Sequence, residues 1–105
     1  MSEPRLSDLM ERGHQLRPRQ AFGRAFDGPD GACAAGCVRL AWGELRDRRF
    51  DQHPFYGLQF PDLALVCPEC RTRDYGSAHS AIVHLNDDHR WPVPRIVAWL
   101  REQGL

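Results

Sequence analysis

Apolar residues recur at helical spacing in three parts of the chain. Residues 3–12 carry two leucines and a methionine on one face, and we expect a short helix that ends at Gly13. From Ala32 onward, small and apolar residues predict a second and more deeply buried helix. A third helix is expected from Pro94, because the missing N–H of proline would have no partner in the first helical turn anyway.

The stretch before the last helix has a different pattern. Residues 46–61 mix charges, aromatic side chains and two prolines, which predicts an irregular connection. The run DLALV at 62–66 predicts a short strand, and we expect a second strand at 71–75 and a helix from about Ala78. The predicted fold class is therefore α+β and mostly helical, with N-terminal helices, a ββα unit and a final helix.

Length and composition limit the architecture. The chain has 105 residues, of which 42% are hydrophobic and 27% charged, close to ordinary globular proteins. A chain of this length seldom forms two cores, so we expect one small domain over residues 1–105. The sequence has no internal repeat, which argues against a solenoid or an array of fingers.

The charge is balanced, with 14 basic and 14 acidic side chains, and every basic residue is arginine. A neutral total argues against nonspecific coating of nucleic acid, since that affinity comes from neutralising phosphates. Local contact with nucleic acid stays open at two groups of arginines. These candidate residues are Arg17, Arg19, Arg24, Arg71 and Arg73.

The sequence begins without an apolar leader and contains no apolar run near the ~20 residues that a membrane span requires. We therefore expect a cytoplasmic protein that has no membrane partner. In a reducing cytosol, its four cysteines are more readily explained as thiols or metal ligands than as disulfides.

The stretch CPECRTRDYGSAHSAIVHLNDDH brings two cysteines and two histidines into a ligand pattern. Cys67 and Cys70 are separated by two residues, and His84 and His89 follow on the predicted helix. Two thiolates on a tight turn and two imidazoles on a helix can surround one zinc ion tetrahedrally. We expect one structural zinc ion, held within a subregion of residues 63–91.

This stretch resembles the two-cysteine two-histidine zinc finger, in which an aromatic residue follows the second cysteine. Tyr75 is that aromatic residue here, and Ala81 stands where the family has a leucine. Because His84 and His89 are five residues apart, we expect a distorted helix end or His89 just beyond it. His79 is an alternative ligand.

The cysteines allow two other interpretations. The motif CPEC after an apolar strand is similar to the dithiol of glutaredoxin-type proteins, but those folds require a helix directly after the cysteines. Cys33 and Cys37 could form a second metal pair, but burial in the core is favoured because no obvious ligands complete the set.

Four protein ligands leave a zinc ion without an open position, so we expect no enzymatic activity. The finger helix positions that read DNA fall on Ser77, His79, Ser80 and Val83, and none makes bidentate base contacts. The motifs CAAG and HLNDDHRW also resemble small phage and prophage proteins, which commonly act on host machinery. We expect an adaptor or inhibitor that binds another protein; the alternative is a nucleic-acid-binding regulator. The aromatic segment at 50–60 is the candidate binding surface, and packing of this segment in the core is the alternative.

Overall fold

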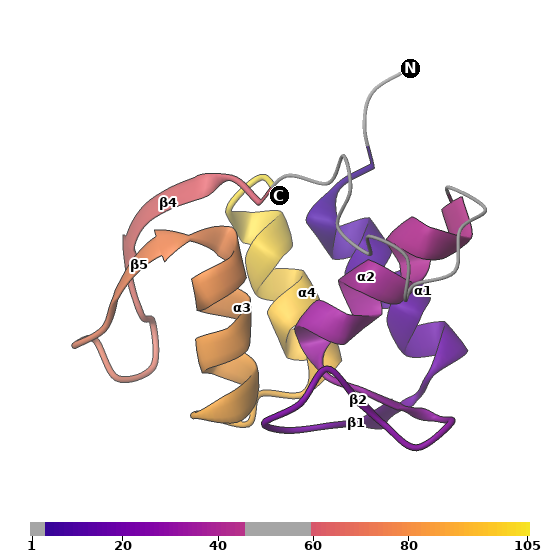
Figure 1. Ribbon diagram of the computed structural model, residues 1–105. Coiled ribbons are helices and arrows are strands. Elements are labelled where there is room, and N and C mark those ends of the chain that lie inside the picture. The colour runs from indigo at the N-terminus through magenta and orange to yellow at the C-terminus, as the bar shows by residue number, and fades with distance from the viewer. Residues whose placement is uncertain (1–3, 46–59) are drawn as a thin grey trace.

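The computed structural model describes residues 4–45 and 60–105 as an α+β fold (Figure 1). Within these ranges, four helices are joined by short strands that form one three-stranded and one two-stranded sheet. In chain order the elements are α1 (Leu6–Leu16), β1 (Arg19–Gln20), β2 (Phe26–Asp27), β3 (Gly31–Ala32), α2 (Ala34–Leu45), β4 (Asp62–Val66), β5 (Asp74–Ser77), α3 (Ala78–Asp87) and α4 (Val93–Glu102).

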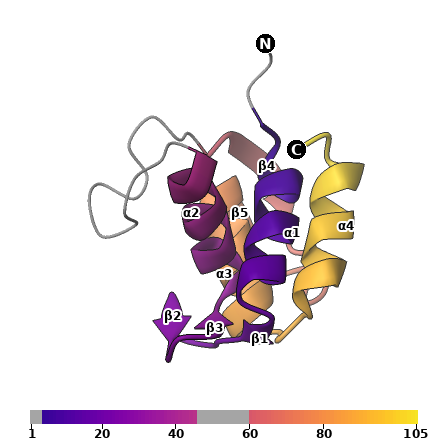
Figure 2. The ribbon, with the colours of Figure 1, turned by 90° about the vertical axis from the view of Figure 1, so that its right-hand side faces the viewer.

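Helix α1 packs against both α2 and α4, as the two ribbon views show (Figures 1 and 2). The helices enclose a core in which Met10, Val38, Ile96 and Leu100 are completely buried. The C-terminus closes this core, because the Ser7 hydroxyl donates a 2.8 Å hydrogen bond to the Leu105 carbonyl. The first and last helices are thereby held together.

The prediction that the first helix ends at Gly13 is wrong. Helix α1 begins at Leu6 and continues through Gly13 to Leu16. Gly13 lies where α1 crosses α2, and a Cβ atom there would collide with the backbone carbonyl of Cys37. This glycine permits a close helix contact, and that packing outweighs its poor helix propensity.

The three-stranded sheet was not expected from the sequence. Strand β3 lies in the middle, parallel to β1 and antiparallel to β2. Arg17 donates hydrogen bonds to the carbonyls of Gly28 and Gly31 and lies over the Phe26 ring. Each strand has two residues, which is too short for an alternating pattern.

The second sheet is an antiparallel hairpin of β4 and β5, in which Leu65 pairs with Tyr75. Strand β5 begins at Asp74, later than expected, because a turn after the cysteines includes Arg71 at a φ of 60°. Strand β5 runs directly into α3, which packs against β5, α2 and α4. The predicted ββα order is present, and α4 follows it.

None of the described helices is both long and apolar enough to cross a membrane. The expected irregular connection and the aromatic segment at 50–60 lie outside the described residues, apart from their last positions. Of these, Phe60 is partly buried against the core.

Candidate metal centre

The turn that carries the two cysteines is built by the backbone. The N–H of Cys67 donates to the Arg73 carbonyl at 2.8 Å, which closes the hairpin around the turn. The N–H of Arg71 donates to the Cys67 carbonyl at 3.0 Å, and the N–H of Glu69 points at the Cys67 sulfur at 3.4 Å. Two intervening residues therefore suffice to bring both sulfurs to the same side.

Helix α3 supplies the first imidazole. Ser77 caps its N-terminus by accepting a 3.2 Å hydrogen bond from the N–H of Ser80. Ala81, Ile82 and Leu85 are all completely buried and belong to the hydrophobic core. His84 lies on the side of the helix that faces the cysteines.

The second imidazole comes from just beyond that helix. Helix α3 ends at Asp87, and Arg90 then has a φ of 54°, which turns the chain toward α4. The expectation that His89 lies past the helix end is confirmed. On a regular helix, the side chains of His84 and His89 would point roughly 140° apart. Because His89 lies beyond the helix, this restriction does not apply to it.

The ligand atoms of Cys67, Cys70, His84 and His89 all lie within 4.8 Å of one another. The Nε2 atoms of the two histidines are 3.0 Å apart, and the Cys70 sulfur is 3.6 Å from His84 Nε2. A tetrahedral zinc with ordinary bond lengths places two nitrogens about 3.3 Å apart and nitrogen and sulfur about 3.6 Å apart. The donor set and its spacing therefore fit one metal ion.

The other nitrogen of His84 is held by a carboxylate. His84 Nδ1 lies 2.6 Å from Asp88 Oδ2, so the ring donates its Nδ1–H and presents Nε2 to the cysteines. Carboxylates in this position fix the tautomer and orientation of metal-binding histidines. Asp87 instead accepts a 2.9 Å hydrogen bond from the N–H of Gly23. Asp88 thus orients a ligand, and Asp87 holds a loop.

The surroundings lower the pKa of both thiols. The hydroxyl and the backbone N–H of Thr72 are the main groups that lower the pKa of Cys70, to about 5. Burial raises the pKa of Cys67, but hydrogen bonds from Tyr75 and from two backbone N–H groups outweigh it and lower the pKa. The Tyr75 hydroxyl is buried and has no other hydrogen-bond partner among the described residues. It is well placed to stabilise a metal-bound sulfur.

The pKa values of the two histidines shift in the opposite direction and are raised. Burial lowers the pKa of His84, but hydrogen bonds to Cys70 and Asp88 outweigh burial and raise it. The pKa of His89 is also raised, mainly by its hydrogen bond to Cys70. The same contacts between sulfur and imidazole therefore lower the pKa of the thiols and raise the pKa of the histidines. Metal binding at such a site releases protons, because the ligands must be deprotonated.

The glutamate of the CPEC motif ties the cysteine turn to the last helix, a role that the sequence analysis missed. Glu69 Oε2 accepts a 3.1 Å hydrogen bond from the Trp91 indole and lies 3.5 Å from the Arg95 guanidinium. Arg95 also lies 3.7 Å above the Trp91 ring. A glutamate and a tryptophan 22 positions apart give no local pattern that would reveal this contact.

The alternative ligands lie elsewhere. The ring of His79 packs edge-on against Phe60 with 4.9 Å between centroids, outside the four-residue cluster. Cys33 and Cys37 are buried thiols in the helical core, and burial raises the pKa of each. The cysteines of the CPEC motif are followed by a turn and β5 rather than by a helix. This arrangement differs from the one that glutaredoxin-type dithiols require.

The candidate arginines do not form a single surface. Arg17 is bound to the loop carbonyls described above, and Arg19 pairs with Asp27 and Asp30. Arg24 is largely exposed and lies 3.9 Å from Asp27. Arg71 and Arg73 belong to the separate turn after the cysteines and are exposed. Two of the five candidates are thus engaged in holding their own loop together.

In comparisons with known proteins, no family model, no curated protein and no solved structure matches this chain. The resemblances to zinc fingers and to phage proteins therefore stay predictions from short motifs. What the structure adds is the Cys67, Cys70, His84 and His89 cluster, which could hold one metal ion.

Proposed function

We propose that this chain is a small zinc-stabilised binding protein that acts through contacts with another protein. The observation that carries the proposal is the convergence of two thiols and two imidazole Nε2 atoms within 4.8 Å. Two sulfur and two nitrogen donors are typical of structural zinc, whereas calcium and magnesium prefer oxygen. Zinc would link the cysteine turn of the hairpin, α3 and the connection from α3 to α4.

A zinc ion with four protein ligands has no open position for water or substrate, so its contribution is to folding. Binding energies of structural zinc are about 10–16 kcal/mol in small peptides, enough to decide whether a short chain folds. A structural zinc ion would make the surrounding surface rigid, so that it could serve as a binding face. This argument favours an adaptor or inhibitor over an enzyme.

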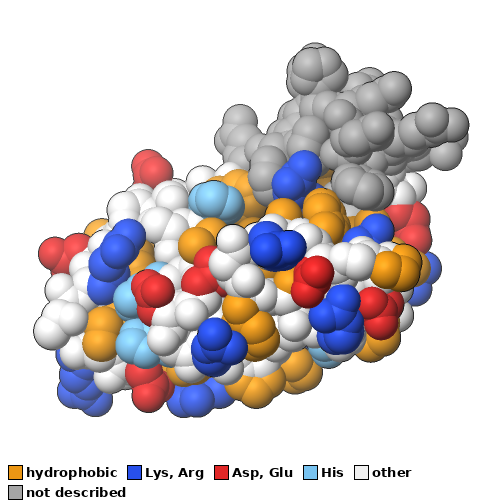
Figure 3. Space-filling view, turned by 60° about the horizontal axis from the view of Figure 1, so that its bottom comes forward, with side chains coloured by type: hydrophobic (Ala, Val, Ile, Leu, Met, Phe, Trp, Pro, Cys, Tyr) orange, Lys and Arg blue, Asp and Glu red, His pale blue; other side chains and the backbone are white. Residues whose placement is uncertain are grey.

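Nucleic-acid binding is the second candidate, and the charge distribution argues against it. Figure 3 shows basic and acidic side chains interspersed on the face that it presents, without one continuous basic patch. Arg17 and Arg19 already have hydrogen-bond partners within the protein. Affinity for a polyanion depends on several arginines that are free to neutralise phosphates.

The zinc proposal is tested by elemental analysis of the purified, folded chain. We expect one zinc per chain, and we expect Cys67→Ser and His89→Ala to lose it. The matched control is His79→Ala, which should retain one zinc because this ring packs on Phe60 outside the cluster. A folded, monodisperse protein without stoichiometric metal would overturn the proposal.

The binding role is tested separately, by affinity capture from source cells with the zinc-loaded chain as bait. We expect a specific protein to be recovered in a nuclease-resistant complex. Recovery of nucleic acid alone, with binding that falls steeply as salt rises, would favour the second candidate instead.

A further inference from the structure

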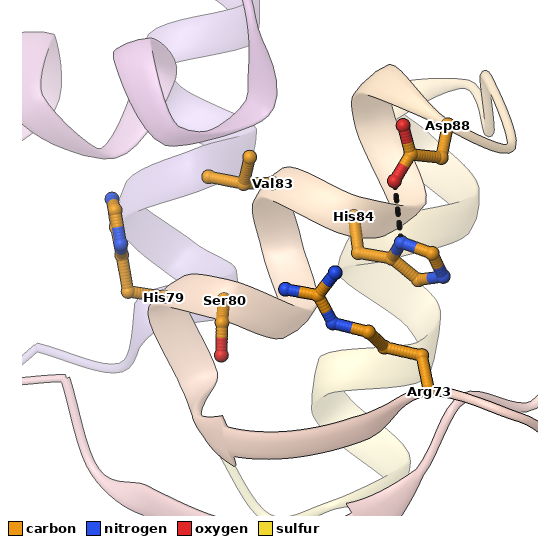
Figure 4. A pocket seen from close by; sticks show the side chains of 6 residues that line it. All are labelled: Arg73, His79, Ser80, Val83, His84 and Asp88. Carbon is orange, nitrogen blue, oxygen red and sulfur yellow. Dashed lines mark hydrogen bonds and ion pairs between the residues drawn. The ribbon is translucent and has the colours of Figure 1, made fainter.

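The outer side of α3 carries a pocket next to the metal centre. It has a volume of about 360 Å³ and is lined by six residues (Figure 4): Arg73, His79, Ser80, Val83, His84 and Asp88. Five of these belong to α3 or its C-cap, and Arg73 reaches across from the hairpin turn. The pocket is therefore formed by the same two elements that the zinc would join.

Arg73 is the charged group that this pocket offers to a ligand. Its side chain points toward α3 between Ser80 and His84 (Figure 4). No hydrogen bond or ion pair joins its guanidinium to the described residues, whereas Arg19, Arg95 and Arg101 all have acidic partners. An arginine with a pocket beneath it and no acidic partner is suited to an anion from outside.

The acid in the pocket does not cancel this charge directly. Asp88 is paired with His84 at 2.6 Å, and no ion pair joins it to Arg73 within the described chain. The Val83 side chain is half-buried and supplies an apolar wall, and Ser80 donates its hydroxyl to the Ser77 carbonyl. The pocket thus combines one planar cation with an apolar surface.

These features favour a single carboxylate on a short apolar stem. A guanidinium binds a carboxylate through two parallel hydrogen bonds, while the stem packs on the apolar wall. A phosphodiester chain would bring repeated negative charges past Asp88, with one arginine in the pocket to neutralise them. Charge complementarity therefore points to an acidic side chain rather than to nucleic acid.

We propose that this pocket is the docking site for a glutamate or aspartate side chain of the partner protein, bound by Arg73. The inference rests on the proposed function and specifies the chemistry of its partner. Arg73 supplies the forked hydrogen bonds, and Val83 contacts the stem of the acidic side chain. Zinc holds the hairpin that carries Arg73 against α3.

The test uses the ¹⁵N-labelled, zinc-loaded full chain and two capped tripeptides, one with a central glutamate and one with a central glutamine. We expect the glutamate peptide to shift the Arg73 Nε–Hε signal and the amides of Ser80 and Val83, with millimolar affinity. The glutamine peptide should bind at least about tenfold more weakly, because it cannot form charge-assisted bonds. Equal binding of the two peptides would overturn the proposal.

Arg73→Gln should lower the affinity for the glutamate peptide at least about tenfold. Arg73→Lys should lower it less, since the positive charge remains but the two parallel hydrogen bonds of the guanidinium are lost. Arg71→Gln is the matched control: it removes a nearby exposed arginine that does not line the pocket, and affinity should stay within about twofold. An unchanged affinity in Arg73→Gln, or tighter binding of a single-stranded oligonucleotide at these residues, would also overturn the proposal.

Zinc content and the amide spectrum of each sample distinguish a failure of the pocket proposal from a failure of the zinc proposal. If the chain is zinc-loaded and folded but does not discriminate between the peptides, the pocket proposal fails and the zinc proposal stands. If the folded chain holds no zinc, the proposed function fails whichever peptide binds.

Discussion

The side-chain oxygen of Asn86 accepts a 3.0 Å hydrogen bond from the backbone N–H of Ala34, which joins the last turn of α3 to the first turn of α2. Asn86 is buried and also bonds to Gln20 at 2.8 Å and to the Ala21 carbonyl at 3.0 Å. Gln20 in turn accepts from the N–H of Val93 at the start of α4. This network connects the helix that carries His84 to the N-terminal half of the protein.

Replacing Asn86 with leucine should destabilise the whole fold. The change leaves the Ala34 N–H and the Ala21 carbonyl buried without their partner, and each unsatisfied group costs about 1–3 kcal/mol. We expect the free energy of unfolding of the zinc-loaded protein to fall by about 2–6 kcal/mol, measured by urea denaturation.

The control is Gln15→Leu, which makes a similar change at an exposed position of α1 and should alter stability by less than about 0.5 kcal/mol. A loss in Asn86→Leu no larger than that of the control would show that the network contributes little.

Features that depend on neighbouring residues could be predicted from the sequence. The helices after Gly31 and Ser77, strand β4 and the cysteine turn all follow from local spacing, capping and turn chemistry. The spacing of the four metal-binding side chains also identified a group that the fold brings within 4.8 Å. These parts are specified over a few residues or one supersecondary unit.

Features that depend on distant contacts could not be predicted. Gly13 looked like a helix end, and the reason that α1 continues is the close approach of Cys37 on another helix. Asn86, the single asparagine of the chain, stands beside two aspartates in the sequence, and its role depends on a partner 52 positions away. Tertiary packing overrides local propensity in both cases.

Removing the hydroxyl of Thr72 should make metal binding more sensitive to acid. The Thr72 hydroxyl donates to the Cys70 sulfur at 3.3 Å and is the largest contribution that lowers the pKa of this thiol to about 5. Because the folded pKa lies below the ordinary value of 9.0, the thiolate favours the folded state above that value, and this contribution is lost as pH falls toward 5.

Thr72→Val raises the pKa of Cys70, so protons displace the metal at a higher pH. We expect the midpoint of metal release to rise by about 0.5–1 pH unit, followed by the thiolate-to-cobalt absorption of the cobalt-substituted protein. Thr72→Ser retains a hydroxyl and should keep the original midpoint. A midpoint that is the same in all three proteins would show that the hydroxyl does not tune this sulfur.

Removing the carboxylate of Asp88 should weaken metal binding without abolishing it. Asp88 holds Nδ1 of His84 at 2.6 Å and so directs Nε2 toward the other ligands. Loss of such partners typically lowers metal affinity 10–100-fold. We expect this loss in Asp88→Ala, measured by competition with a chromophoric zinc chelator.

Asp62→Ala removes an exposed carboxylate at the start of β4 and serves as the control for the change in net charge. Its zinc affinity should match that of the unaltered protein. If both variants lose affinity equally, the effect comes from long-range charge and not from the orientation of His84.

The contact between α1 and α2 leads to the last prediction, in which local and tertiary effects oppose each other. Gly13→Ala should favour the α1 helix by about 1 kcal/mol if propensity decided the outcome. The added methyl group, however, would meet the rigid Cys37 backbone, and separating two packed helices costs about 1–3 kcal/mol or more. We expect a net loss of stability, seen as a lower thermal midpoint of the zinc-loaded protein.

Gly76→Ala is the control, since its added methyl group points into open space and its φ is not in the left-handed region. A Gly13→Ala protein that melts at or above the temperature of the unaltered chain would mean that this glycine is not needed for the helix contact.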